Sequence, residues 1–179
     1  MSAPFLDLGD GVELRAWSLD DAPEIFAVVE ANRDHLRAWL PWVDRTAGPV
    51  QIAEFIERSR KRDDAREANG IYVNDVLRGS AGLSWATEEM EGEIGYWVAA
   101  DAQGRGLATR AARALTTYGF EEVGLHRMVI KAGTGNTRSR AVAERLGFVQ
   151  EGILREGGTT GLGRVDLVVY GLIVHEWTP

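Results

Sequence analysis

The sequence predicts one domain with a mixed α/β or α+β fold, in which helices pack on a mixed, largely antiparallel sheet. The chain has 179 residues, a length that suits a single hydrophobic core. Its apolar periodicity changes in the order strand, helices, strand meander, helix, strand, helix, strands. No internal repeat, low-complexity stretch or linker divides the sequence. We therefore expect a single domain over residues 1–179 with about seven strands.

Composition and charge exclude several classes of protein. The chain is 45% hydrophobic and 26% charged, as ordinary soluble globular proteins are. No apolar run approaches the roughly 18 residues that cross a bilayer, and the first residues lack the basic and apolar segments of a secretory signal. The net charge of −7 lacks the basic footprint of a general nucleic-acid binder. We expect a cytoplasmic protein with no membrane or nucleic-acid partner.

The absence of cysteine excludes further kinds of structural and functional site. It excludes a disulfide framework, a cysteine nucleophile and a thiolate metal site. The three histidines, His35, His126 and His175, show neither a Ser-His-Asp arrangement nor metal-ligand spacing. We expect them to be structural or surface residues, and we expect no metal.

The first elements have recognisable boundaries. Residues 11–17 alternate apolar and polar side chains, which predicts a strand. Asp21 is a good helix cap, with Pro23 in the first turn and Glu24 placed to reach back to the cap. A second, short helix should end just before Pro41, because the residue before a proline avoids the helical conformation.

A third helix over residues 49–68, ended at Gly70, leads into a predicted antiparallel meander. Its short β-rich runs are separated by glycines and by an acidic stretch. Gly147 is expected to close the last helix. The remaining expected elements are strands over 71–77, 81–86, 93–99, 126–131, 148–154 and 165–174, and helices over 105–119 and 136–146.

Residues 93–109 combine a strand, a glycine-containing loop and a helix start. Gly104 and Gly106 let the backbone turn tightly and approach a ligand. The free N–H groups and the dipole of a helix start favour an anion, such as the phosphates of a nucleotide. The alternative is a plain strand-to-helix turn, since glycine loops are weak signals. No Gly-Lys pair exists for a P-loop, and Thr109 stands where a dinucleotide fingerprint has its third glycine.

Residues 103–108, Gln-Gly-Arg-Gly-Leu-Ala, are similar to the acetyl-CoA signature of the GCN5-related N-acetyltransferase (GNAT) superfamily. That signature has Arg or Gln, two residues, Gly, one residue, and then Gly or Ala. The resemblance runs from about Leu14 to Trp177 and is closest to the ribosomal-protein N-terminal (serine/alanine) acetyltransferase branch. The further segments that carry it are residues 36–42, 93–97, 136–139, 144–148 and 151–155, and Asp166.

The resemblance implies the GNAT fold, with helices on both faces of the sheet, and acetyl transfer from acetyl-CoA to a primary amine. The branch implies the N-terminal α-amine of a ribosomal protein as acceptor, and a homodimer. An α-amine is roughly 10% neutral at pH 7 and a lysine well under 1%, so an α-amine needs less help from a base. The alternatives are a small-molecule amine (a polyamine, an aminoglycoside or an amino acid) and a CoA-binding regulatory module without turnover.

The resemblance also assigns residues to acetyl-CoA. Backbone N–H groups of the loop and helix start would hold the pyrophosphate, and Arg105 would add a charge contact. The pantetheine would pair with the preceding strand, and a backbone N–H near Val98 would polarise the thioester carbonyl. Asn136 would both cap its helix and face the pantetheine. The implied cofactor-binding residues are Tyr96, Trp97, Val98, Gln103, Gly104, Arg105, Gly106, Leu107, Ala108, Thr109, Asn136 and Ser139.

The implied catalytic residues are Ser139 and Glu93. Many superfamily members use a tyrosine on the Ser139 helix as proton donor to the departing thiolate. Arg145 stands at the matching position here, and this departure from the family pattern favours Ser139 as the donor. The alternative for Ser139 is a polar residue at a helix start. Glu93 is the preferred base, alone or through a water, with Glu156 as a weaker candidate and an exposed strand glutamate as the alternative. Trp39 and Trp42 would form the wall of the acceptor groove, or else belong to the core.

Overall fold

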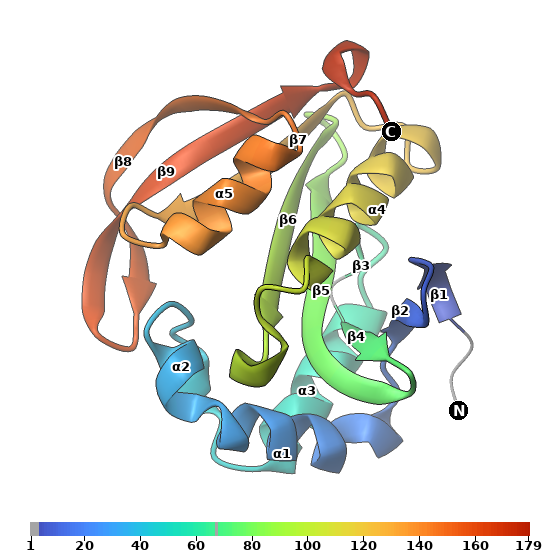
Figure 1. The fold of residues 1–179 in the computed structure, drawn as a ribbon, viewed down its shortest axis with the longest axis vertical. Coiled ribbons are helices and arrows are strands. Elements are labelled where there is room, and N and C mark those ends of the chain that lie inside the picture. Colours follow the sequence, from blue (N-terminus) through green and yellow to red (C-terminus); the bar gives the residue numbers. More distant parts are fainter. Residues whose placement is uncertain (1–3, 67) are drawn as a thin grey trace.

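The part of the chain that the structure describes, residues 4–66 and 68–179, folds around a nine-stranded sheet (Figure 1). This computed structural model has short 3-10 turns between several of its elements. Its strands are β1 (Pro4–Asp7), β2 (Val12–Ala16), β3 (Ala65–Arg66), β4 (Asn69–Val73), β5 (Val76–Ala86), β6 (Glu91–Val98), β7 (Arg127–Gly133), β8 (Val149–Thr160) and β9 (Gly163–Ile173). Its helices are α1 (Ala22–Ala31), α2 (Arg33–Arg37), α3 (Pro49–Arg60), α4 (Leu107–Glu121) and α5 (Thr137–Arg145).

The strands lie in the order β1-β2-β4-β5-β6-β7-β9-β8, and β3 pairs with β5 beside this path. β6 and β7 pair in parallel, whereas the other neighbours pair antiparallel. A parallel pair needs a crossover connection, and α4 provides it. The mixed, largely antiparallel sheet is therefore confirmed, with nine strands rather than about seven. The two strands that the sequence did not predict are the short β1 and β3.

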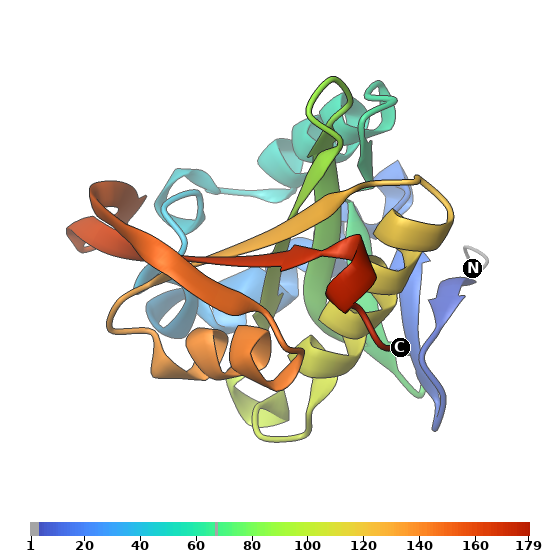
Figure 2. The same ribbon diagram turned by 90° about the horizontal axis from the view of Figure 1, so that it is seen from above.

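Helices cover both faces of the sheet, as expected (Figures 1 and 2). Helices α4 and α5 lie on one face, over a core that includes the fully buried Leu115 and Met128. Helices α1 to α3 lie on the other, over a second core that includes Ile25 and Ile56. Burying one such side chain contributes about 1.5–3 kcal/mol, so the strands between the cores are fixed from both sides.

Helix α1 begins where the sequence predicts, but the carboxylate of Asp21 accepts hydrogen bonds from residues before the helix and not from the helix itself. The backbone N–H of Ser18 donates to Asp21 Oδ2 at 2.7 Å, and its hydroxyl donates to the same oxygen at 2.9 Å. The Asp21 side chain makes no cap hydrogen bond to α1. It stabilises instead the 3-10 turn Leu19–Asp21 that leads into the helix.

The helix expected over residues 49–68 is shorter than predicted. Helix α3 ends at Arg60, and residue 67 of the expected range lies outside the described residues. Gly70 does not end a helix; it lies inside β4. A side-chain carbon at this position would lie 2.4 Å from Trp17 Nε1 and 2.6 Å from Tyr72 Cε2. Close packing within the sheet, and not a helix C-terminus, therefore requires this glycine.

One predicted strand boundary in the meander is wrong, because the chain turns at Asn74 and Asp75. Asn74 and Asp75 have φ of 47° and 65° and connect β4 to β5, so the strand expected over 71–77 is interrupted there. This left-handed pair is typical of two-residue hairpin turns, in which Asn and Asp are favoured. Gly79 lies within β5, where a side-chain carbon would approach Trp97 O at 2.3 Å.

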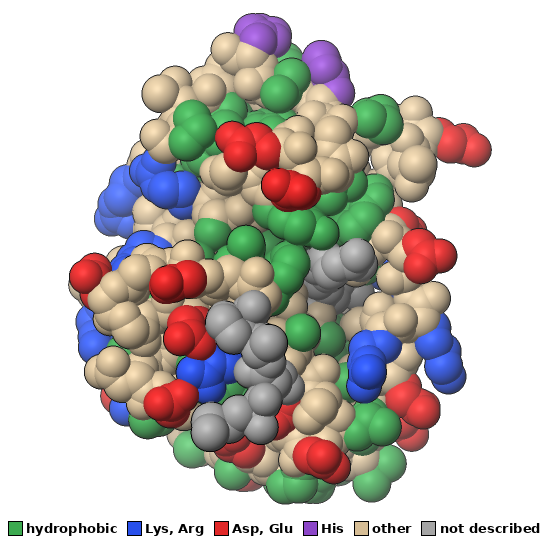
Figure 3. All heavy atoms as spheres, turned by 90° about the vertical axis from the view of Figure 1, so that its right-hand side faces the viewer, with side chains coloured by type: hydrophobic (Ala, Val, Ile, Leu, Met, Phe, Trp, Pro, Cys, Tyr) green, Lys and Arg blue, Asp and Glu red, His purple; other side chains and the backbone are tan. Residues whose placement is uncertain are grey.

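The face of the molecule in Figure 3 carries Asp and Glu side chains alongside Lys and Arg. Within residues 4–66 and 68–179, no helix has both the length and the apolar character to cross a membrane.

The sheet opens in its middle, and this opening positions the site. β6 and β7 pair only as far as Glu93 and Val129, although β6 continues to Val98 and β7 to Gly133. Beyond that point β6 stays paired with β5, and β7 stays paired with β9. The two strands therefore diverge as a fork, and the backbone groups on its inner edges have no strand partner.

Candidate functional site

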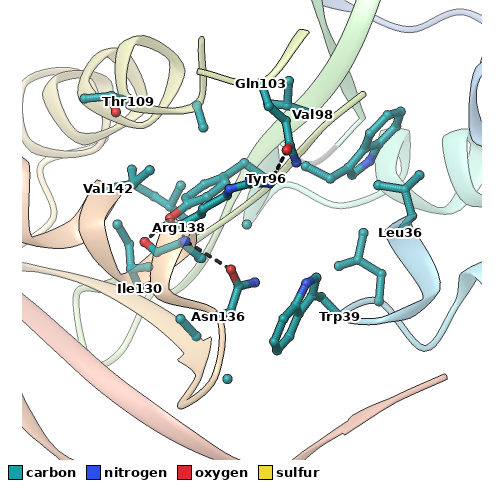
Figure 4. A pocket seen from close by; sticks show the side chains of 18 of the residues that line it. Leu36, Trp39, Tyr96, Val98, Gln103, Thr109, Ile130, Asn136, Arg138 and Val142 are labelled. Carbon is teal, nitrogen blue, oxygen red and sulfur yellow. Dashed lines mark hydrogen bonds between the residues drawn. The ribbon is translucent and has the colours of Figure 1, made fainter. Parts of the chain in front are cut away.

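A cleft of about 830 Å³ occupies the fork between β6 and β7 (Figure 4). Its walls come from both faces of the sheet. Thr109 of α4 and Val142 of α5 lie on one side, and Leu36 of α2 and Trp39 lie on the other. The cleft thus runs through the sheet, from the face of the glycine loop to the face of α2.

The glycine loop forms one end of the cleft. Gly104 and Gly106 have φ of 73° and 72°, a left-handed conformation that glycine adopts without strain. No atom lies within 4 Å of where a side-chain carbon would stand at either position, so the loop faces open space. The first hydrogen bond of α4 runs from Arg110 N–H to Gly106 O at 2.9 Å. The N–H groups of residues 107–109 therefore have no partner inside the helix, which suits an anion.

Helix α5 begins at the opposite wall. Asn136 is its N-cap, as the sequence predicts: its Oδ1 accepts from the backbone N–H of Ser139 at 3.1 Å. Both residues line the cleft. The cap thereby sets the first turn of α5 so that Ser139 lies beside β6.

Tyr96 and Val98 lie on the β6 edge of the fork. Ala99 N–H donates to Arg78 O of β5, so by strand alternation the N–H and C=O of Val98 point away from β5 and toward the fork. The Tyr96 hydroxyl lies 3.1 Å from both the carbonyl oxygen and the Oγ of Ser139. Burial raises the pKa of the Tyr96 phenol to about 12, so this hydroxyl stays protonated at neutral pH.

A chain of hydrogen bonds crosses the mouth of the cleft. Arg138 of α5 donates to Gln103 Oε1 (Figure 4). The Gln103 amide nitrogen lies 2.8 Å from His35 Nε2 of α2. Because arginine can only donate, Gln103 must present its oxygen to Arg138 and its amide N–H to His35. His35 Nε2 also lies 3.3 Å from the carbonyl oxygen of Val98, so this ring contacts both the glycine loop and β6. The sequence interpretation of His35 as a structural or surface residue missed this place in the wall.

Glu93 lies at the point where the fork begins. It is the last β6 residue paired with β7, and its carboxylate accepts from Lys131 Nζ at 2.7 Å. Its side chain is 47% exposed, and Lys131, not Glu93, lines the cleft. The structure therefore brings Glu93 to the edge of the cleft, in an ion pair.

Trp39 lies across the cleft from β6, next to Asn136 (Figure 4). A side-chain carbon at Gly133 would lie 3.2 Å from its ring, and one at Gly135 would lie 3.5 Å from it. The glycines of the turn between β7 and α5 thus make room for the indole. Trp42 does not line the cleft; it packs on Trp97, with ring centroids 6.3 Å apart.

The structure gathers twelve of the fifteen site residues that the sequence indicated into one cleft wall. These are Trp39, Tyr96, Trp97, Val98, Gln103, Gly104, Gly106, Leu107, Ala108, Thr109, Asn136 and Ser139. Glu93, Arg105 and Trp42 lie outside that wall, and so does Glu156, whose N–H is bound to Asp166 Oδ1 at 2.7 Å.

Sequence reasoning missed Arg138, His35 and Lys131 as wall residues. Arg138 had a usable signal, since it lies between Asn136 and Ser139 in the first turn of a helix expected at the site. Within residues 4–66 and 68–179, no group of three or more His, Asp and Glu is arranged to hold a metal ion.

Comparison with known families agrees with this geometry. Residues 12–149 match the family described as the acetyltransferase (GNAT) domain. The ribosomal-protein-serine acetyltransferase of Escherichia coli (strain K12) is 35% identical over 178 residues, covering 96% of this chain and 97% of its own. The YdaF protein of Bacillus subtilis (strain 168), provisionally named a ribosomal N-acetyltransferase, is 33% identical over 175 residues, covering 95% of each chain.

Solved structures share the fold at lower identity. RimL, a ribosomal L7/L12 α-N-protein acetyltransferase in complex with coenzyme A, superposes with a TM-score of 0.88 at 23% identity, covering 94% of this chain and 97% of its own. MccE, a microcin C7 self-immunity acetyltransferase in complex with acetyl-CoA and AMP, superposes with a TM-score of 0.85 at 24% identity, covering 93% and 94%.

Proposed function

Because the chain belongs to the GNAT family of N-acetyltransferases, we propose that it moves the acetyl group of acetyl-CoA to the N-terminal α-amine of a protein, with ribosomal proteins as the first candidates. The serine acetyltransferase of Escherichia coli, similar over nearly the full length of both chains, supports this acceptor.

The observation that carries the choice of acceptor is the charge of the cleft. Among the described residues that line it, none is an aspartate or a glutamate. Its charged side chains are Arg110, Lys131, Arg138 and Arg145. A polyamine or an aminoglycoside would bring several ammonium groups into this wall with no carboxylate to pair them, which is costly. A protein N-terminus brings one amine, which reacts in its neutral form.

Acetyl-CoA fits the donor half of the cleft. The free N–H groups at the start of α4 are suited to its pyrophosphate, with the Arg138 guanidinium across the cleft as a second anion contact. The inner edge of β6 offers strand-like hydrogen bonds to the pantetheine amides. The Val98 N–H is then placed to donate to the thioester carbonyl as that oxygen becomes negative.

Four further residues would bind the acceptor, accept its proton and stabilise the leaving thiolate. Trp39 and Leu36 give the acceptor an apolar wall, which favours the uncharged amine at the reacting carbon. Glu93 accepts the proton that the amine loses, directly or through a water, from its place where β6 and β7 part. Ser139 donates a hydrogen bond to the sulfur of the departing thiolate.

A thiol-release assay with acetyl-CoA tests the acceptor class. The panel contains peptides that begin with Ser or Ala, the same peptides with a blocked N-terminus, a lysine peptide with a blocked N-terminus, spermidine and an aminoglycoside. We expect turnover with the free N-terminal peptides and none with their blocked forms. Turnover on spermidine or the aminoglycoside alone would replace the protein acceptor with a small amine.

A further inference from the structure

We propose that Tyr96 is a positioning residue for acetyl transfer, which turns the hydroxyl hydrogen of Ser139 toward the sulfur of acetyl-CoA. The inference rests on the proposed role of Ser139 and extends it to a second hydroxyl, from a different element. Tyr96 comes from the sheet, 43 residues before Ser139 in the chain. It would supply, from β6, a tyrosine hydroxyl beside the first turn of α5.

The geometry fixes the two hydroxyl groups against each other. Tyr96 packs against the core under α4 and α5, whereas its neighbour Trp97 packs against the opposite core. The Tyr96 ring therefore points at α5, and its hydroxyl lies 3.1 Å from both oxygens of Ser139. The Ser139 backbone N–H is occupied by the Asn136 cap at 3.1 Å. Among the Ser139 polar groups, the hydroxyl hydrogen is the one whose direction these contacts leave open.

The two hydroxyl groups carry one hydrogen each, and this limits where the serine hydrogen points. The carbonyl oxygen of Ser139 can only accept, whereas in the contact between the two hydroxyls either oxygen can donate. The phenol hydrogen therefore serves one of the two Ser139 oxygens at a time. When it is donated to Ser139 Oγ, the serine hydrogen is free to point into the cleft, which both residues line. Because burial raises the pKa of Tyr96 to about 12, the phenol keeps its hydrogen throughout the working range of the enzyme.

Without the phenol, the Ser139 hydroxyl can donate its hydrogen to a backbone carbonyl oxygen and not to the sulfur. Serine and threonine hydroxyls in helices tend to bond the carbonyl oxygen one turn back. Thr116 in α4 does this, donating to Ala112 O at 2.8 Å. For Ser139, in the first turn of α5, the carbonyl three residues back is that of the N-cap residue Asn136. Removing the Tyr96 hydroxyl would release Ser139 to turn backward, away from the sulfur.

The chemical step balances without a proton leaving either hydroxyl. The neutral amine attacks the thioester carbon, so a C–N bond forms and the carbonyl electron pair moves to oxygen. The C–S bond then breaks, and its electron pair stays on sulfur as a thiolate, with the Ser139 hydroxyl as hydrogen-bond donor to that charge. The proton of the amine leaves for the base or for water, and the thiolate takes a proton from water. Tyr96 acts through Ser139 and touches neither substrate at the reacting atoms.

Three variants test the inference: Tyr96→Phe, Ser139→Ala and the double variant. Tyr170→Phe is the matched control, because Tyr170 is also a sheet tyrosine whose hydroxyl contacts α5, donating to Glu144 Oε1 at 2.8 Å, outside the cleft. The measurements are kcat and KM for acetyl-CoA with the best acceptor, and the thermal midpoint with and without CoA. We expect Tyr96→Phe to lower kcat about tenfold, the scale of one hydrogen bond, with KM for acetyl-CoA changed less than about twofold.

The double variant decides between positioning and packing. If Tyr96 acts through Ser139, the double variant should be no slower than Ser139→Ala, and CoA should still raise the thermal midpoint of Tyr96→Phe as it does for the unchanged protein. A tenfold loss that persists in the Ser139→Ala background, or a similar loss in Tyr170→Phe, would overturn the inference. Unchanged kcat in Ser139→Ala would instead remove Ser139 from the proposed function. A large effect of Ser139→Ala with none of Tyr96→Phe would reject Tyr96 alone.

Discussion

Arg138 and Arg105 offer a direct comparison at the scale of single residues. Arg138 lines the cleft and donates to Gln103, whereas Arg105, in the glycine loop, lies outside the cleft wall. We predict that Arg138→Ala raises KM for acetyl-CoA about tenfold, near the lower end for a hydrogen bond to a charged group, because Arg138 is exposed. Arg105→Ala should change this KM less than about twofold. Steady-state kinetics with acetyl-CoA and with S-acetylpantetheine, which lacks the pyrophosphate, measure the effect. An equal loss with both donors would contradict a phosphate contact.

Glu93 allows a second prediction, since a base is needed only while the amine is protonated. Glu93→Gln should lower kcat/KM for an N-terminal peptide about 100-fold at pH 7 and clearly less at pH 9, where most of an α-amine is already neutral. The measurement is kcat/KM at both pH values. Lys131→Met is the control, because it removes the 2.7 Å ion pair and leaves the carboxylate in place. An equal loss for Glu93→Gln at both pH values would show a structural role.

Helix α5 begins with a residue that has a structural role and also belongs to the cleft wall. Asn136 caps the helix and also lines the cleft. Aspartate caps helices about as well as asparagine, whereas alanine costs about 1 kcal/mol, or roughly 2–4 °C in a chain of this size. We predict that Asn136→Asp keeps the thermal midpoint but raises KM for acetyl-CoA, because it removes the amide donor and adds a negative charge. Thermal unfolding and kinetics of Asn136→Asp and Asn136→Ala separate the two tasks; an unchanged KM in Asn136→Asp would leave Asn136 as a cap alone.

The elements that the sequence predicts well are those whose signals are local. Gly104 and Gly106 marked the loop and the start of α4, and Asn136 and Gly147 marked the two ends of α5. Asn74-Asp75 carries an equally local turn signal, but glycines were expected to separate these strands, so one strand boundary was misplaced.

Contacts between distant elements could not be predicted in the same way. The pairs Tyr96–Ser139, Gln103–Arg138 and Glu93–Lys131 are separated by 43, 35 and 38 residues. They depend on where β6 and β7 part, and thus on strand register. No local pattern of apolar residues specifies the point at which two parallel strands stop pairing. The glycine loop could therefore be predicted from the sequence, whereas the hydrogen bonds across the cleft could not.

The pH dependence of the whole enzyme is expected to follow the protonation of the acceptor amine. An α-amine with a pKa near 8 gains its neutral form about tenfold per pH unit below that value. For a peptide N-terminus, kcat/KM of a Glu93→Gln enzyme should therefore rise with unit slope up to about pH 8 and then level off. Because the raised pKa of Tyr96 is about 12, its phenol should cause no decline before pH 10. A rise that continues to pH 10 would point to a lysine acceptor.

The fork between β6 and β7 also favours one kinetic scheme for the two substrates over another. Its cleft is open toward the glycine loop on one face of the sheet and toward Trp39 on the other, so the two substrates need not exchange places. A ternary complex with direct transfer is then the natural kinetic scheme, and a chain with no cysteine also lacks the most nucleophilic side chain for an acetylated intermediate. Initial-rate plots for the two substrates should intersect, and labelled CoA should not exchange into acetyl-CoA until an acceptor is added. Parallel plots with such exchange would mean that the acetyl group rests on the protein between two half-reactions.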